Sequence, residues 1–150
     1  MASIIGFNHS GLVVRDIEKM VAYYRDVLGL AVRREIDSVA PPHGDHTGIP
    51  GAHRTLVFVG KPEGEHALEL VHYIQPPSPG EHHPAQNIVG AEHICFNVDN
   101  LKELYEQLTA RGVHFVTPPI FRETPEGLIM GICYSQDPEG NWVEFIQPPT

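Results

Sequence analysis

The sequence predicts an α+β fold made of two tandem copies of one β-α-β-β-β module. Three observations lead to this prediction. A strand-like segment that carries a histidine is followed by an amphipathic helix, and this happens once in each half of the chain. Each helix is followed by three further strand-like segments. A segment rich in proline, QPPSPGEHHP at residues 75–84, separates the two halves.

In the first half, residues 7–14 alternate between apolar and polar side chains, as a half-buried strand does. Asp16 is placed to cap a helix, and Gly29 is placed to end it. Strand-like segments follow at residues 30–36, 52–59 and 66–73. The apolar stripe of the predicted helix has helical spacing and consists of Ile17, Met20, Val21, Tyr24 and Leu28.

The second half repeats this order. Residues 93–98 form the first strand, Asn100 or Asp99 caps the helix, and Gly112 ends it. Strand-like segments follow at residues 113–117, 128–135 and 141–147. The apolar stripe of this helix consists of Leu101, Leu104, Tyr105 and Leu108. The last strand of each half carries one glutamate between apolar residues, Glu69 in the first half and Glu144 in the second.

We therefore expect a single domain over residues 1–150, with module 1 at 4–75, a linker at 76–89 and module 2 at 90–148. An insert rich in proline and glycine, residues 37–51, interrupts the first module. It is predicted to be a long loop that folds over another part of the molecule, and its role stays open. The segment Asp137–Asn141 has the residue types of a tight turn.

Composition excludes several classes of function. The formal net charge is −9 and there is no basic run, which argues against nucleic acid or an anionic membrane as a partner. The chain contains no apolar run near the ~20 residues of a membrane span, and its start lacks the features of a signal peptide. The cysteines, Cys95 and Cys133, lie in apolar strand-like segments. We expect both to be free, buried thiols in a reducing cytoplasm.

Four polar side chains are predicted to share one face of the sheets. Side chains alternate across a strand, so residues two apart point the same way. In each half, one set of apolar residues packs on the helix and the polar residues point to the opposite face: His9, Glu69, His93 and Glu144. That face also carries apolar residues, namely Phe7, Val13, Val71, Trp142 and Ile146.

Each of these four residues alone has an ordinary structural explanation. A single histidine at a strand start is usually exposed or hydrogen-bonded, and a single glutamate in a strand usually faces water. The set is more informative, because an unpaired carboxylate on an apolar face costs several kcal/mol. Two imidazoles and two carboxylates that meet on such a face would be balanced by one divalent cation, Zn, Ni, Co, Mn or Fe(II).

The repeat and its ligands resemble the vicinal oxygen chelate superfamily, which includes glyoxalase I, methylmalonyl-CoA epimerase, extradiol dioxygenases and bleomycin resistance proteins. The stretches NHSGLVVRDIEKMVAYYRDVLGL and YSQDPEGNWVEF carry the resemblance, which covers nearly the whole chain. It implies that the modules form a cupped, barrel-like mixed sheet with the helices outside. It also implies that four residues hold the metal as in glyoxalase I: His9, Glu69, His93 and Glu144.

The resemblance further implies the chemistry. In this superfamily a metal ion chelates two adjacent substrate oxygens and stabilises an enolate or oxyanion, and a base moves a proton on the neighbouring carbon. We therefore expect a glyoxalase-like lyase, isomerase or epimerase that acts on a small α-oxygenated carbonyl substrate. By position, Glu144 is the first choice for the base and Glu69 the second.

Three residues are candidates for substrate binding, each with a structural alternative. Arg54 could bind a carboxylate or phosphate, or it could form a strand-edge ion pair. Alternation places Tyr73 on the same face as Glu69. Trp142 could form an apolar wall of the pocket or belong to the core. The chain lacks an obvious basic cluster for a coenzyme A tail and a clear set of contacts for glutathione carboxylates, so the substrate stays open.

Two other functions remain possible on the same residues. An Fe(II) extradiol-type dioxygenase would use His9 or His93 with a carboxylate as a facial triad with open positions for oxygen. A fourth protein ligand such as Glu69 would fill one of those positions. A binding protein of the drug-resistance type would need no turnover, and the intact ligand set argues against it. Members of this superfamily often pair, so a homodimer is expected, with the metal ligands drawn from one chain or from two.

Overall fold

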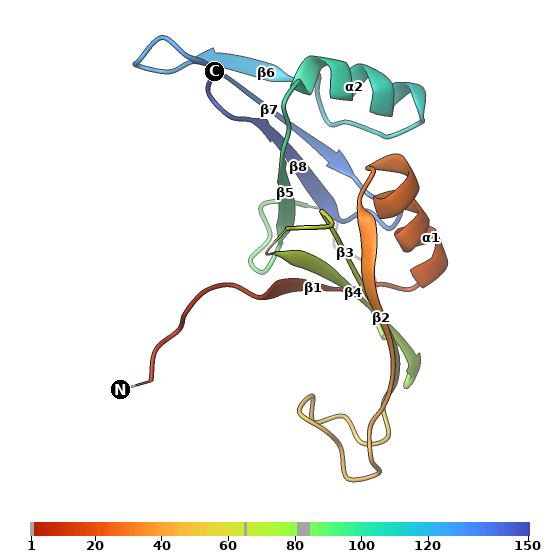
Figure 1. The fold of residues 1–150 in the computed structure, drawn as a ribbon. Helices are drawn as coiled ribbons and strands as arrows, with labels where there is room; N and C mark the ends of the chain where they lie inside the picture. The colour runs from red at the N-terminus through yellow and green to blue at the C-terminus, as the bar shows by residue number, and fades with distance from the viewer. Residues whose placement is uncertain (1, 65, 81–84) are drawn as a thin grey trace. The chain divides into compact units, whose positions relative to one another are not determined.

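The computed structural model describes residues 2–64, 66–80 and 85–150. The chain divides into two compact units, Met1–Gly80 and Glu81–Thr150. Each unit contains one four-stranded mixed sheet and one helical segment in the order β-α-β-β-β, and this confirms the α+β class and the tandem repeat (Figure 1). Residues 81–84 of the predicted linker lie outside the described residues. No helix in the described ranges is long and apolar enough to cross a membrane.

The sheet of the first unit has the strand order β1-β4-β3-β2. Strand β1 runs parallel to β4, and the other two pairs are antiparallel. The predicted order of elements is therefore correct. The bounds are β1 (His9–Val13), α1 (Ile17–Ala22), the π-helical turn η1 (Tyr23–Val27), β2 (Ala31–Val39), β3 (His53–Gly60) and β4 (Ala67–Gln75).

The helical segment of the first unit begins and ends where the sequence predicts. The side chain of Asp16 accepts a hydrogen bond from the backbone N–H of Lys19 at 3.0 Å, which satisfies one of the free donors of the first turn. Gly29 has a φ of +74°, the left-handed conformation that ends many helices. Met20 and Tyr24 are fully buried, and α1 packs on β3 and β4.

The second unit repeats this plan with the strand order β5-β8-β7-β6. Strand β5 is parallel to β8, and the remaining pairs are antiparallel. Asn100 caps α2 by accepting from the backbone N–H of Glu103 at 3.1 Å. The bounds are β5 (His93–Asn97), α2 (Leu101–Ala110), β6 (Ile120–Glu123), β7 (Ile129–Gln136) and β8 (Trp142–Gln147).

One predicted strand of the second unit was wrong. Residues 113–117 make a single bridge, Phe115 to Ser135, and the strand β6 begins only at Ile120. Pro118 and Pro119 lie between the two segments. A proline has no N–H to donate to a neighbouring strand, so regular pairing resumes only after both prolines have passed.

Two boundaries in the first unit also differ from the prediction. Strand β1 begins at His9 rather than at Phe7, and the Phe7 side chain is exposed. The N-terminal segment that precedes β1 is extended (Figure 1). The loop predicted at residues 37–51 begins only after Val39, because β2 continues to that residue. Val39 pairs with His53 at the start of β3.

The alternation predicted for the strands is present. In β4, Leu68 and Leu70 are buried, whereas Glu69 between them points to the other face. In β8, Val143 and Phe145 are likewise buried on the helix side. Burial does not alternate in β8, because Glu144 is buried as well. The strand register still places Glu144 on the same face as His93, and Glu69 on the same face as His9, away from the helix of each unit.

Gly131 marks a close approach within the second unit. A Cβ atom there would lie 2.7 Å from a ring carbon of Phe121 and 3.0 Å from Cδ2 of Leu101. Leu101 is fully buried at the start of α2. Strand β7 can therefore approach the first turn of α2 only because residue 131 lacks a side chain.

Candidate metal-binding half-sites

His9 and Glu69 form the half-site of the first unit. The parallel register of β1 and β4 places Gly11 opposite Glu69, so His9 and Glu69 lie on the same face two residues apart along the strand direction. The Nε2 atom of His9 is 3.3 Å from Oε2 of Glu69. The side chain of Glu69 is 16% exposed and that of His9 is 39% exposed, so the pair is accessible from outside the sheet.

The other ring nitrogen of His9 has a fixed partner. Its Nδ1 atom lies 2.7 Å from Oδ1 of Asn8, and because a carbonyl oxygen only accepts, Nδ1 donates the hydrogen. In the neutral ring Nε2 then carries a lone pair that faces the lone pairs of the Glu69 carboxylate. With this tautomer, the Nε2 lone pair and the Glu69 carboxylate are both donors that a metal ion can use.

His93 and Glu144 form the corresponding half-site of the second unit. Register places Cys95 opposite Glu144, as it places Gly11 opposite Glu69. The Nε2 atom of His93 is 3.1 Å from Oε2 of Glu144. The Glu144 side chain is only 8% exposed, whereas His93 is 51% exposed. The same geometry thus occurs once in each unit, with the second carboxylate more deeply buried.

Glu144 has polar neighbours on both adjacent strands. Tyr134 lies opposite it on β7 and Cys95 opposite it on β5. Burial, then hydrogen bonding to Glu144 and its negative charge, raises the pKa of Tyr134 to about 12. Partial desolvation of the thiol, followed by the negative charge of the neighbouring Glu144 carboxylate, raises the pKa of Cys95 to about 12. Both groups therefore carry their protons at neutral pH and can donate to the carboxylate.

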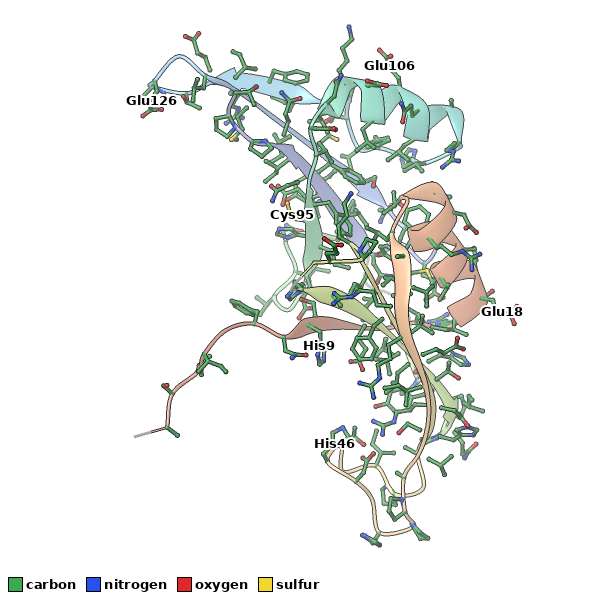
Figure 2. All side chains as sticks on the ribbon, viewed as in Figure 1. His9, Glu18, His46, Cys95, Glu106 and Glu126 are labelled. Carbon is green, nitrogen blue, oxygen red and sulfur yellow. The ribbon has the colours of Figure 1, made fainter. Side chains whose placement is uncertain are left out.

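Cys95 is exposed, which corrects the prediction that both thiols are buried. It lies on the face of β5 that is turned away from α2 (Figure 2). Cys133 is buried as predicted, and burial followed by the charge of Glu144 raises its pKa to about 11. In a strand that packs on a helix, the helix covers every second side chain. Cys95 is one of the side chains that point the other way, so it stays accessible.

Arg54 is buried within the first unit and bound to the loop between β2 and β3. Its Nη2 atom donates to Asp45 and, at 3.1 Å, to the hydroxyl of Ser38. Its guanidinium carbon lies 5.9 Å from the centre of the Tyr73 ring, so the two side chains stack. Of the two roles predicted for Arg54, the structure shows the ion pair, with Asp45 as the partner. This ion pair fixes the loop between β2 and β3, which carries His46 at its surface (Figure 2).

Asp45 is the loop residue that makes this contact. The hydroxyl of Thr47 donates to it at 2.6 Å and the backbone N–H of Thr47 donates at 2.9 Å. These two bonds, together with the charge of Arg54, lower the pKa of Asp45 to about 2. The Asp45 carboxylate is therefore ionised at any ordinary pH and acts as a permanent anchor.

Trp142 lies opposite His93 in the register of β5 and β8. Its side chain is half-buried, and its indole Nε1 is buried with no hydrogen-bond partner among the described residues. Buried indole N–H groups usually have a partner. The indole N–H itself is enclosed by the protein, whereas the half-buried ring lies beside the second half-site.

Each half-site supplies two donors of the types that bind divalent metals. Within the described residues, no three side chains of His, Cys, Asp or Glu come together as a group that could hold a metal ion. The structure brings together His9 with Glu69 and His93 with Glu144, each pair inside one unit. Neutral imidazole nitrogen and carboxylate oxygen fit Zn, Ni, Co, Mn or Fe(II) by ligand chemistry.

Three residues that sequence reasoning missed contribute to these half-sites or to the neighbouring loop. Asn8 orients His9, Tyr134 lies opposite Glu144 in the register of β7 and β8, and Asp45 binds Arg54. Of these three residues, only Tyr134 could have been predicted from the sequence. The alternation of side chains along β7 places it on the same face of the sheet as Glu144. Asn8 precedes the first strand, and Asp45 lies in an irregular loop, so no periodicity marks either of them.

The chain matches the family model of the Glyoxalase/Bleomycin resistance protein/Dioxygenase superfamily over residues 6–145. With paired β-α-β-β-β modules and a His–Glu pair in each, the chain belongs to this superfamily.

Individual relatives agree with this assignment. A lactoylglutathione lyase of Pseudomonas aeruginosa is 29% identical over 152 residues, which cover 94% of this chain and 81% of the relative. The mitochondrial methylmalonyl-CoA epimerase of Mus musculus is 34% identical over 107 residues, covering 71% of this chain and 53% of the relative. The crystal structure of a glyoxalase family protein from Bacillus cereus has a TM-score of 0.83 at 19% identity, covering 97% of this chain and 95% of that one.

Proposed function

We propose that this protein is a metal-dependent enzyme of the glyoxalase type, a lyase, isomerase or epimerase that acts on a small α-oxygenated carbonyl compound. The observation that carries the proposal is the repeated pairing of imidazole Nε2 with a glutamate oxygen, at 3.3 Å in one unit and 3.1 Å in the other. The similarity to lactoylglutathione lyases and methylmalonyl-CoA epimerases supports the reaction class.

The four donors of the two half-sites would together hold one divalent cation per site, contributed by one chain or by two copies in a homodimer: His9, Glu69, His93 and Glu144. The chemistry of this donor set fits the ion, because the bare Nε2 of His9 and the carboxylate of Glu69 are both donors that a metal ion can use. When bound, such an ion supplies Lewis-acid stabilisation of negative charge on adjacent substrate oxygens.

The residues of the chain would supply the remaining steps. Asn8 holds the His9 ring so that Nε2 points to the half-site. One glutamate accepts a proton from the substrate carbon next to the carbonyl, and the electron pair of the broken C–H bond remains on the substrate as an enolate. Return of that proton to the same or the neighbouring carbon completes the reaction and restores the carboxylate.

Tyr73 and Trp142 would line the substrate site. Arg54 is buried and bound to Asp45 and Ser38, so it would act only through the loop that it anchors, which would exclude water from one side. The substrate itself is proposed only as a class, because the family covers several carbonyl compounds.

The first experiment measures the metal. The purified protein is dialysed, loaded with Co, Ni, Zn or Mn in turn, and analysed for metal per site. We expect binding that is lost in His9→Gln and in His93→Gln and retained in His46→Gln, an exposed loop histidine that serves as the control. Equal binding by all three variants would contradict the ligand assignment.

The second experiment tests the chemistry without knowledge of the substrate. Lactoylglutathione, a methylmalonyl thioester and simple α-hydroxy ketones are incubated with the loaded protein in D2O, and deuterium at the carbon next to the carbonyl is followed by NMR. Incorporation above the rate with metal alone supports enolate formation. Oxygen uptake with bound iron would favour the dioxygenase alternative, and tight binding without exchange would favour a binding protein.

A further inference from the structure

One row of side chains crosses all four strands on the face of the first unit that carries the half-site. Strand register places four residues next to one another in the order β1-β4-β3-β2: Gly11, Glu69, Phe58 and Arg34. Residues that pair directly on neighbouring strands point to the same face of a sheet. Arg34 therefore shares the face of Glu69, and Phe58 lies between them. The Phe58 ring in turn contacts the His9 ring edge-on, with the ring centres 5.6 Å apart.

A bulge in β2 places Arg34 in this row rather than its neighbour. The register between β2 and β3 shifts between Val32 and Arg34, so Arg33 is the additional residue. The Arg33 side chain donates to the backbone oxygen of His66 at 3.2 Å, so it is bound to the protein itself. Arg34 pairs with Phe58 and is exposed. Of these two adjacent arginines, Arg34 is the one presented beside the half-site.

The side chain of Arg34 has no hydrogen-bond or ion-pair partner within the described part of the chain. The other arginines of the first unit each donate to a carboxylate or to a backbone carbonyl: Arg15, Arg25, Arg33 and Arg54. Acidic residues outnumber lysine and arginine by 19 to 10, so a shortage of carboxylates does not explain the free guanidinium. Glu69, in the same row, pairs with His9 instead. Arg34 is therefore available to a ligand on this face.

A second guanidinium on this face is already neutralised. Arg54 pairs with Ser38 on one side and with Tyr73 on the other, so it lies on the same face as Arg34. Arg54 is only 3% exposed and is bound to the carboxylate of Asp45. The sequence suggested Arg54 as the residue that binds an anion. The structure leaves Arg34 as the cation that is both unpaired and exposed beside the half-site.

The corresponding place in the second unit is apolar. Tyr134 holds the position of Phe58, because each lies opposite the glutamate of its unit. The backbone beside Tyr134 is that of Val116, whose N–H donates to the Tyr134 carbonyl oxygen at 2.9 Å. Val116 is an exposed apolar residue. The two half-sites therefore have the same donors but unlike surroundings, and a ligand with one charged end would bind in one orientation.

We infer that Arg34 is a substrate-binding residue, and that the substrate carries an anionic group, a carboxylate or a phosphate, in addition to its α-oxygenated carbonyl. This rests on the proposed function. A guanidinium binds either group through two parallel N–H donors. Neighbouring strands are about 4.8 Å apart, so two spacings, about 10 Å, separate the backbone of Arg34 from that of Glu69. The long arginine side chain covers part of this span, which places the anionic group a few bonds from the chelating oxygens.

A pair of hydroxamic acids tests this inference through one change of charge. Butyrohydroxamic acid and the monohydroxamic acid of succinic acid chelate a metal ion through the same two adjacent oxygens, and their chains have the same length. The succinic compound ends in a carboxylate where the butyric compound ends in a methyl group. Each compound is titrated into the Co²⁺-loaded protein, and calorimetry with the visible spectrum of Co²⁺ gives its affinity. This readout does not depend on turnover.

We expect the unmodified protein to bind the succinic compound about tenfold more tightly than the butyric compound. Arg34→Gln should lose this preference and keep its affinity for Co²⁺ and for the butyric compound, because Arg34 is not a metal ligand. Arg34→Lys should keep part of the preference, since an ammonium group retains the charge without the paired donors. Arg122→Gln removes an exposed arginine of the second unit, controls for net charge and should keep the full preference.

The net charge of −9 repels an anion, so a preference for the succinic compound requires a local cation. Equal affinity for the two compounds in the unmodified protein would overturn the inference while the metal site stands. An equal loss of preference in Arg34→Gln and Arg122→Gln would also overturn it, because the effect would then come from total charge. Thermal melting followed by circular dichroism confirms that each variant folds.

Metal-free protein separates this inference from the proposed function. If the unmodified protein binds no Co²⁺, the proposed metal site is wrong, and the anion site is then judged without metal. Inorganic phosphate is added to ¹⁵N-labelled protein, and the side-chain N–H signals of the arginines are followed by NMR. A saturable shift of the Arg34 signal, with no shift of the Arg122 signal, supports the anion site. An Arg34 signal that does not move overturns it.

Discussion

The Nε2 atom of His9 lies 3.3 Å from Oε2 of Glu69 while the Nδ1 atom of the same ring is held 2.7 Å from Asn8. The contact to Asn8 decides which nitrogen faces the carboxylate without a hydrogen. A histidine oriented in this way presents one nitrogen lone pair in a fixed direction, which the proposed metal site requires.

Asn8→Ala should therefore weaken metal binding without removing a ligand. We expect affinity for Zn²⁺ or Co²⁺ to fall about tenfold, because the His9 ring loses the partner that fixes its orientation and tautomer. Isothermal titration measures the affinity. Asn87→Ala, a change at an exposed asparagine of the second unit, should leave it unaltered. An Asn8→Ala protein that binds as tightly as the unmodified chain would show that the contact has no such role.

The ion pair of Asp45 and Arg54 makes the stability of the first unit depend on acid pH. The pKa of Asp45 is lowered from 3.8 to about 2 in the folded protein by its two bonds to Thr47, and further by Arg54. A lowered pKa stabilises the folded state above the unfolded value of 3.8, and this contribution disappears as the pH falls toward 2.

We expect the difference in unfolding free energy between the unmodified protein and Asp45→Asn to be largest above pH 4. It should shrink steadily as the pH falls toward 2, because both forms then carry an uncharged side chain at residue 45. Urea unfolding between pH 6 and pH 2.5 measures this. A difference that does not change with pH would mean that Asp45 is not ionised in the anchor.

Cys95 should be poorly reactive although it is exposed. Its thiol pKa of about 12 keeps it protonated at pH 8, and the thiolate is the reactive form. Metal-free protein treated with iodoacetamide should be alkylated at Cys95 far more slowly than a free cysteine, with a rate that rises up to pH 11. Glu144→Gln removes the negative charge beside the thiol and should accelerate the reaction. Mass spectrometry of the modified peptide gives both rates.

Gly131→Ala should destabilise the second unit. The added methyl group would lie 2.7 Å from Phe121 and 3.0 Å from Leu101, and overpacking of this kind costs about 1–3 kcal/mol. Chemical unfolding measures the loss. Combining it with Phe121→Ala should recover part of the stability, because Phe121 is partly exposed and its removal frees space. An unaltered midpoint in Gly131→Ala would show that β7 and α2 can separate easily.

Much of the fold follows from periodicity in the sequence. Alternation in β4 and β8 places Glu69 and Glu144 opposite the helix faces, and the same reasoning places His9 and His93. These predictions succeed because a strand has a fixed period, so one buried face determines the other. The helix ends were equally clear, since caps and glycine stops are local chemistry.

The remaining features depend on contacts that have no period. The strand predicted at residues 113–117 was displaced because Pro118 and Pro119 prevent pairing there, and apolar pattern alone favours strand on either side of them. The bond between Asp45 and Arg54 joins an irregular loop to a strand nine residues away in sequence, and only the folded loop brings them together.

Phe58 on β3 and Tyr134 on β7 hold equivalent positions, each opposite the glutamate of its unit, and they differ by one hydroxyl group. The donors themselves are of the same type in both units, a histidine on the first strand and a glutamate on the last. A change one strand away leaves these donors in place and alters only their surroundings. A comparison of donor residues alone would therefore count two unlike half-sites as identical.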